Sequence, residues 1–181
     1  MKRKPKNPIT KIRTKNGDGG FTYFGGGNIS KSESILDFVG NIDESCAFLG
    51  KLNDEGLCDD IIKNSLVILF EMGAMVHSSE ALSKYKYRLD DYVVKVENYI
   101  DDYIKNNHLV ELNGFIIPVN YNADIMIART VIRRTERSAV VSDLNWAVPV
   151  LNCMSDLLFL VAWGKTDIHT KQWTGFEKNV N

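Results

Sequence analysis

The 181-residue sequence is poor in cysteine, histidine and proline and has almost no net charge. Its three cysteines, Cys46, Cys58 and Cys153, are odd in number and widely spaced, which fits reduced thiols rather than a disulfide framework. No HxxxH or Cys/His cluster with metal-ligand spacing is present, so we expect no metal site built from protein side chains alone. We interpret each histidine as an ordinary surface histidine or one satisfied by a local hydrogen bond. With 22 basic and 23 acidic residues, no overall field favours nucleic acid or a membrane as partner.

Long apolar runs are also absent. The most hydrophobic segment, residues 151–163, contains Asn152 and Asp156, and no segment approaches the ~18 uninterrupted apolar residues of a membrane span. The basic opening MKRKPKNP is followed by no apolar core of a signal peptide, so we expect a cytoplasmic protein. We expect residues 1–10 to form a flexible basic tail, with a weak contact to nucleic acid or membrane as the alternative, and residues 11–181 to form a single domain.

Apolar residues recur at three- and four-residue steps in several long segments, which indicates helices with one buried face. The segments are residues 32–49, 57–76, 89–104, 123–141 and 145–164. Each predicts a helix of roughly 20 residues, and no strand-like alternation separates them. The sequence therefore predicts an all-α fold, a five-helix bundle.

Two segments do not fit helices. Residues 11–31 are rich in Gly and Thr, and each glycine would cost a helix ~1 kcal/mol. We expect an ordered Gly-rich loop there, with a disordered leader as the alternative. Residues 109–119 contain a short apolar run that begins at Phe115 and is broken by Pro118, which suggests an extended connection packed on the bundle. Loops of this kind often carry function.

The first candidate site is the sequence TKNGDGGFTYFGGGNISK, residues 14–31. Its glycines allow backbone N–H groups to converge on an anion, and Lys15, Thr22 and Lys31 add two charges and a hydroxyl, which together suit a polyphosphate. It is not a Walker loop, because the GxxxxGK[ST] spacing is missing. On composition alone, a plain Gly-rich surface loop remains the stronger alternative.

The second candidate is the sequence ARTVIRRTER, residues 128–137, within the fourth expected helix. Arg129, Arg133 and Arg137 fall at i, i+4 and i+8 and form a stripe along one margin of the apolar face. A row of bidentate guanidinium groups suits a triphosphate. A solvated helix face is an equally strong interpretation of such a charge run.

The third feature is a pair of carboxylates within apolar helices, Asp43 and Asp156. A buried carboxylate without a partner is costly, so each is expected to have a cationic or hydrogen-bonding partner, and the arginine stripe is the available source. Asp43 falls at the edge of its apolar face, where a neighbouring helix or subunit could reach it. The alternative is an exposed aspartate without a special role.

The order and separation of these elements resemble the PduO-type ATP:cob(I)alamin adenosyltransferases. That family is similar in T-K-x-G-D-x-G-x-T near the start, G-x-V-D-E-L on the first helix, A-R-x-x-x-R-R-x-E-R on the fourth and N-R-L-S-D on the fifth. This sequence matches those patterns at Thr14, Lys15, Gly17, Asp18, Thr22, Gly40, Asp43, Glu44, Ala128, Arg129, Arg133, Arg134, Glu136, Arg137, Asn152, Ser155 and Asp156. Four motifs in order, spread over the whole domain, are hard to obtain by chance.

The resemblance implies transfer of the 5′-deoxyadenosyl group of ATP to cob(I)alamin with release of triphosphate, aided by Mg²⁺, in a homotrimer with sites between subunits. Asp43 and Arg129 match a pair that bridges two subunits, and Arg133 joins them as the third implied catalytic residue. Phe115 matches an aromatic residue that displaces the lower axial ligand of cobalamin. The implied ATP-binding residues are Thr14, Lys15, Asn16, Gly17, Asp18, Thr22, Lys31, Arg133, Arg134, Glu136, Arg137 and Asn152.

The sequence departs from the family pattern mainly on the corrin side. The family usually has Pro-Gly-Gly after the aromatic residue, whereas this chain has Pro118, Val119 and Asn120. Cys153 and Trp163 each stand where the family commonly has Arg. An alternative function is therefore a non-catalytic nucleotide-binding protein, a sensor or sequestering module on the same trimeric scaffold. A purely structural bundle is the third hypothesis.

Overall fold

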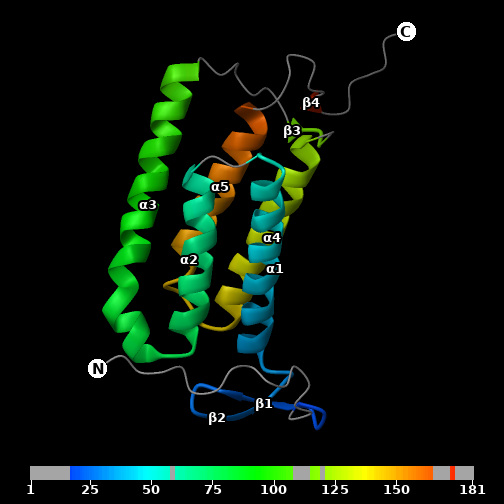
Figure 1. The fold of residues 1–181 in the computed structure, drawn as a ribbon, viewed down its shortest axis with the longest axis vertical. Helices are drawn as coiled ribbons and strands as arrows, with labels where there is room; N and C mark the ends of the chain where they lie inside the picture. The colour runs from blue at the N-terminus through cyan, green and yellow to red at the C-terminus, as the bar shows by residue number, and fades with distance from the viewer. Residues whose placement is uncertain (1–16, 58–59, 108–114, 119–120, 165–171, 174–181) are drawn as a thin grey trace.

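The computed structural model describes residues 17–57, 60–107, 115–118, 121–164 and 172–173. Five helices in these ranges form the bundle of Figure 1: α1 Ser34–Asp54, α2 Asp60–Val76, α3 Ser79–Asn107, α4 Tyr121–Val141 and α5 Val148–Gly164. The all-α five-helix prediction is confirmed. Helix α3 is longer than expected, at 29 residues. The predicted tail, residues 1–10, lies outside the described residues.

Helix α5 is the most buried helix of the bundle. It packs against both α3 and α4, while α1 packs against α2 and α4. Ten of the 17 residues of α5 are buried, and a helix that is apolar on nearly every side belongs inside a bundle. This explains the hydrophobicity of residues 151–163. Within the described part of the chain, every helix is too short or too polar to span a membrane.

Polar contacts set the position of α4 against α1. Ser45 Oγ and Thr135 Oγ1 are buried and lie 2.8 Å apart, and both reach the backbone carbonyl of Asn41, at 2.7 and 3.1 Å. Nearer the other end of α1, Lys51 Nζ lies 3.0 Å from a carboxylate oxygen of Asp124. Because buried hydroxyls must be paired, these contacts select one register of the two helices. The arginine motif of α4 therefore has a defined position relative to α1.

Residues 17–31 form a β-hairpin and its closing turns rather than the expected loop. Strands β1, Phe21–Phe24, and β2, Gly27–Ser30, are antiparallel. Gly25 and Gly26 join them with φ angles of 58° and 96°, which a two-residue hairpin turn requires and glycine adopts without strain. The backbone N–H of Lys31 donates to the carbonyl of Gly20 at 2.8 Å and closes the open end.

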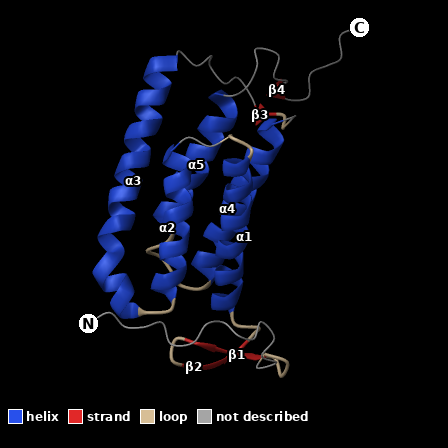
Figure 2. Cartoon of the chain, in the orientation of Figure 1, coloured by secondary structure: helices blue, strands red, loops and turns tan. Residues whose placement is uncertain are grey.

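The strands lie at the two ends of the bundle (Figure 2). The hairpin lies where α1 begins, and strand β3, Phe115–Ile116, lies at the opposite end, paired with β4, Gln172–Trp173. The extended connection predicted for residues 109–119 is confirmed at Phe115–Ile116, and its first six residues and Val119 lie outside the described residues. Its expected packing on the bundle is wrong for Phe115, whose side chain is 72% exposed.

Candidate functional site

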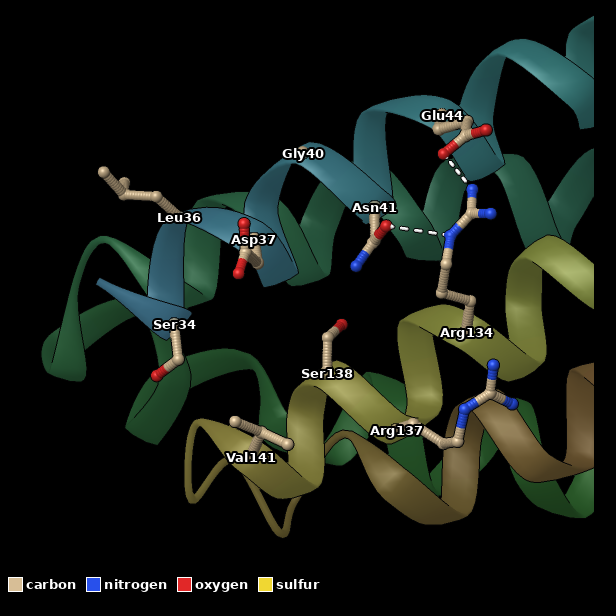
Figure 3. A pocket seen from close by; sticks show the side chains of 10 residues that line it. All are labelled: Ser34, Leu36, Asp37, Gly40, Asn41, Glu44, Arg134, Arg137, Ser138 and Val141. Atoms are coloured by element: carbon tan, nitrogen blue, oxygen red, sulfur yellow. Dashed lines mark hydrogen bonds and ion pairs between the residues drawn. The ribbon is translucent and has the colours of Figure 1, made fainter. Parts of the chain in front are cut away.

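Helix α4 carries the arginine motif and divides its side chains between two neighbouring helices. Arg134 faces α1, where its Nε donates to Oδ1 of Asn41 at 3.2 Å and its guanidinium pairs with the carboxylate of Glu44. Figure 3 shows this reach across from α4 to α1. Arg129 instead contacts Phe159 of α5. Arg134 and Arg129 thus meet different helices, as expected for positions five residues apart on a helix that turns 100° per residue.

A pocket of about 530 Å³ lies between the first half of α1 and the second half of α4 (Figure 3). This volume is within the range of small-molecule sites. Arg134 and Arg137 line it from α4, and Gly40 from α1 leaves space that a side chain would fill. Within the described residues, Arg137 has no ion-pair partner, whereas Arg134 is already engaged with α1. Arg137 is therefore available to a bound anion.

Arg129 lies against α5. Its Cζ atom is 5.2 Å from the centroid of the Phe159 ring, a cation–π distance. Its buried Nε has no hydrogen-bond partner among the described residues. Burial and then the charge of Arg133 lower the pKa of Arg129, and Asp156 acts in the opposite direction. The structure thus brings Asp156 near the arginine stripe, as the sequence predicts, although Asp156 is exposed rather than buried.

Asp43 is exposed on α1 and has no ion pair within the described part of the chain. No contact joins it to Arg129 in the same chain. Its charge acts on Cys46, where burial first and Asp43 second raise the pKa of the thiol to about 11. Asp43 and Arg129 thus present an exposed acid and an incompletely paired base on different helices. Their predicted pairing across subunits stays a prediction.

The hairpin and its closing turns hold the described part of the Gly-rich motif, residues 17–31. A Cβ atom added at Gly17 would lie 2.7 Å from Nζ of Lys31, so the ammonium group rests against the Gly17 backbone. Thr22 is half-buried and Asp18 is exposed. The structure brings Gly17 and Lys31 into contact. The sequence motif predicts only that both belong to the same loop. The predicted ATP ligands Thr14, Lys15 and Asn16 lie outside the described residues.

Comparison with known proteins decides which family has this arrangement. The sequence model of the family described as cobalamin adenosyltransferase matches residues 12–164, from the hairpin motif to the end of α5. The chain belongs to the cobalamin adenosyltransferase family. The match includes the Gly-rich, first-helix, α4 and α5 motifs, so all four sequence signals lie in the shared domain.

Relatives of known name cover almost the same length. The chain is 32% identical over 168 residues to the cobalamin adenosyltransferase of Cupriavidus metallidurans, covering 86% of this chain and 88% of that protein. It is 31% identical over 166 residues to the corrinoid adenosyltransferase of Bacillus subtilis, covering 84% of each chain. A variant of a PduO-type ATP:corrinoid adenosyltransferase from Lactobacillus reuteri, solved with cobalamin and ATP, shares the fold with a TM-score of 0.72. That structure is 22% identical, with 90% of this chain and 99% of that chain covered.

Cys153, which stands where the family commonly has Arg, is buried, whereas its α5 neighbours Asn152 and Asp156 are exposed. The Cys153 thiol lies 3.8 Å from the carbonyl oxygen of Val93 on α3. Burial first, then Glu97 and Asp156, raise its pKa to about 11. A thiol with this pKa is protonated at neutral pH and is a poor nucleophile. Asn152 itself is exposed on α5.

Sequence reasoning missed two residues that hold the arginines. Asn41 precedes Asp43 by two positions and accepts from Arg134, and Phe159 follows Asp156 by three positions and lies beneath Arg129. The helical spacing of Phe159 from Asp156 is a usable signal, because residues three apart share a helix face. Within the described residues, no group of three or more His, Cys, Asp and Glu side chains is placed to hold a metal ion.

Proposed function

We propose that this chain transfers the 5′-deoxyadenosyl group of ATP to cob(I)alamin and releases triphosphate. Membership of the cobalamin adenosyltransferase family over residues 12–164 supports this reaction. The names of relatives that are about 30% identical, cobalamin and corrinoid adenosyltransferase, support it as well. The proposal requires a site for a triphosphate and a separate aromatic surface for the corrin.

The single observation that favours transfer over nucleotide binding alone is the exposure of Phe115. In a plain binding module this ring would pack on the bundle, and its removal would cost ~3–5 kcal/mol of stability. Instead it is 72% exposed, on a strand whose backbone pairs with β4. An exposed aromatic ring held on paired backbone suits a flat, apolar ligand surface such as the lower face of a corrin.

The triphosphate site is proposed to combine the hairpin with two arginines of α4. Arg133 and Arg137 have no ion-pair partners within the described residues, and Lys31 presents its ammonium group on the hairpin. Thr22 and Asn152 would add neutral hydrogen bonds. Arg134, which is bonded to α1, would act by holding α4 in place.

Mg²⁺ would enter with the nucleotide. Magnesium in nucleotide sites takes most of its ligands from phosphates and water and only one or two from carboxylates. Glu136, half-buried on α4 and next to Arg137 in sequence, is a carboxylate that fits this minor role. When bound, the ion would supply positive charge to the departing triphosphate.

The protein's part in the reaction would be alignment and charge stabilisation. The Co(I) centre of the substrate attacks the 5′ carbon of ATP, a Co–C bond forms, and the C–O bond to the triphosphate breaks with its electrons leaving on oxygen. Arg133, Arg137 and Lys31 would stabilise the departing anion, and fixed placement of both substrates would bring cobalt in line with the carbon. No protein nucleophile is required, which agrees with the protonated thiols of Cys46 and Cys153.

A trimer with sites between subunits is the proposed assembly. Within one chain, the hairpin and Phe115 lie at opposite ends of the bundle, so one pair of reacting substrates could meet both only if two chains contribute (Figure 1). Asp43 and Arg129 offer complementary charges that are not joined within the chain. Light scattering should give a trimer, and Asp43→Arg should dissociate it while Asp43→Arg with Arg129→Asp restores it. The exposed Asp54 provides the control substitution Asp54→Arg; a monomeric parent protein would remove the basis of this pairing.

Calorimetry separates transfer from the alternative module. Titration of ATP with and without reduced cobalamin should show binding of both ligands. Binding of nucleotide alone would support the sensor or sequestering module. That alternative is favoured by the departures from the family pattern on the corrin side, at Trp163 and at residues 119–120. Residues 119–120 lie outside the described residues.

A further inference from the structure

The β1–β2 hairpin is too small to hold its own position. Each strand has four residues, and a two-stranded hairpin of this size is marginally stable in water. Yet the hairpin carries Thr22, and Lys31 follows its second strand. If these two residues and the arginines of α4 bind the same triphosphate, the hairpin must lie at a defined distance from α4. The hairpin therefore requires an anchor on the helical bundle.

The alternation of β1 shows which face is anchored. Phe21 and Tyr23 are 56% and 73% exposed, whereas Thr22 and Phe24 are half-buried. Since alternate residues of a strand share a face, Thr22 and Phe24 lie on the same side of the hairpin. The Phe24 ring contacts the ring of His77, with centroids 4.3 Å apart and planes inclined by 47°.

The His77 ring is itself fixed to the end of α2. His77 follows the last residue of that helix, and its Nδ1 lies 2.8 Å from the carbonyl oxygen of Gly73. A carbonyl oxygen only accepts, so Nδ1 carries the proton and donates it. This bond also satisfies one of the carbonyls that the helix end leaves unpaired. The His77 ring therefore forms a fixed surface against which Phe24 packs.

We propose that His77 is a positioning residue for the hairpin that carries the nucleotide ligands. The inference rests on the proposed function of the hairpin in binding ATP. Loss of the His77 ring would release Phe24, and Thr22, two residues away on the same face, would lose its fixed place. Lys31 at the end of β2 would shift with it. The sequence alone predicts His77 to be an ordinary surface or satisfied histidine, without a role in the site.

The test compares ring loss with ring replacement. In calorimetric titrations of the full chain with Mg²⁺ and ATP, His77→Ala should weaken ATP binding by roughly tenfold. His77→Phe keeps a ring and loses only the hydrogen bond, so its affinity should stay within about threefold of the parent. Phe24→Ala should match His77→Ala, and the double variant should lose no more than either single variant because the two rings act together. Tyr87→Ala, which removes an exposed ring on α3, is the control and should change nothing.

Hydrogen exchange of the hairpin amides without ATP gives a readout that is independent of the proposed function. His77→Ala should speed exchange across β1 and β2, and Tyr87→Ala should not. If the parent binds ATP and His77→Ala binds it equally well, the positioning role is wrong and the proposed function stands. If the parent binds no ATP, the proposed function fails, and unchanged exchange in His77→Ala would separately rule out the anchor.

Discussion

Arg133 and Arg134 are adjacent in sequence, and the structure assigns them different tasks. Arg133 has no ion-pair or hydrogen-bond partner for its side chain within the described residues, so Arg133→Ala breaks no polar contact of the fold. If Arg133 binds a phosphate, the variant loses a charge-assisted hydrogen bond of about 2 kcal/mol, or roughly a 30-fold rise in the Kd of ATP. Its thermal stability should stay close to that of the parent.

Arg134→Ala should behave in the opposite way. The pair with Glu44 is about half exposed on both sides, at 45% and 44%, so it is expected to contribute about 0.2–1 kcal/mol. The hydrogen bond to Asn41 at 3.2 Å adds about 1 kcal/mol. For a chain of this size each kcal/mol corresponds to ~2–4 °C in Tm, so Tm should fall by several degrees while ATP affinity changes little.

Calorimetry with Mg²⁺-ATP measures the ATP affinity of each variant, and thermal unfolding at matched protomer concentration measures its Tm. Arg133→Ala with unchanged ATP affinity would mean that the stripe is only a solvated helix face. An equal loss of ATP affinity in both variants would refute the division of tasks between the two arginines.

Three further predictions follow from the same geometry. Gly17→Ala should displace the Lys31 ammonium group and weaken ATP binding by about fivefold in calorimetry. Its Tm should not fall, because the atom in conflict with the new Cβ is the end of a flexible side chain. An unchanged Kd for ATP would remove Lys31 from the site. Phe115→Ala should cost less than ~1 kcal/mol of stability, because the ring is mostly exposed. It should leave ATP affinity intact while adenosylcobalamin formation falls sharply. An unaffected transfer rate would contradict the proposed corrin role of Phe115. Burial raises the pKa of the Cys46 and Cys153 thiols from 9.0 to about 11, so the unfolded chain ionises first and the stability they confer is lost as pH rises from 9.0 towards 11. In urea unfolding, a variant with both cysteines replaced by Ala should lose less free energy of unfolding over this pH range than the parent. An equal loss would argue against this cause.

Helical periodicity predicted the bundle because a buried face repeats every three or four residues. It gave too short a third helix, since the first ten residues of α3 are mainly polar and two of them, Lys86 and Arg88, form ion pairs. The pairs are Lys86 with Asp90 at 2.8 Å and Arg88 with Glu71 at 2.6 Å. An apolar pattern records burial alone, so helical turns stabilised by surface charges escape it.

The hairpin escaped sequence reasoning, whereas the pairing of Asp43 was predicted and stays a prediction. A four-residue strand is too short for alternation to stand out, although Gly25 and Gly26 between two such runs are a usable turn signal. Asp43 is exposed on α1, in line with its expected place at the edge of the apolar face. Its pairing with Arg129 of another subunit follows the family resemblance alone, because such a contact leaves no pattern in a single chain. The rotation of Arg134 away from Arg129 was predictable, because 100° per residue fixes it. Its bonds to α1 were not, because they depend on how two helices pack.

The most direct test of the proposed transfer is the visible spectrum of the unmodified protein mixed with ATP, Mg²⁺ and chemically reduced cobalamin. Adenosylcobalamin should form in proportion to the triphosphate released, and Arg133→Ala should slow this formation. No adenosylcobalamin in a protein that binds ATP tightly would contradict the transferase function and leave the nucleotide-binding module in its place.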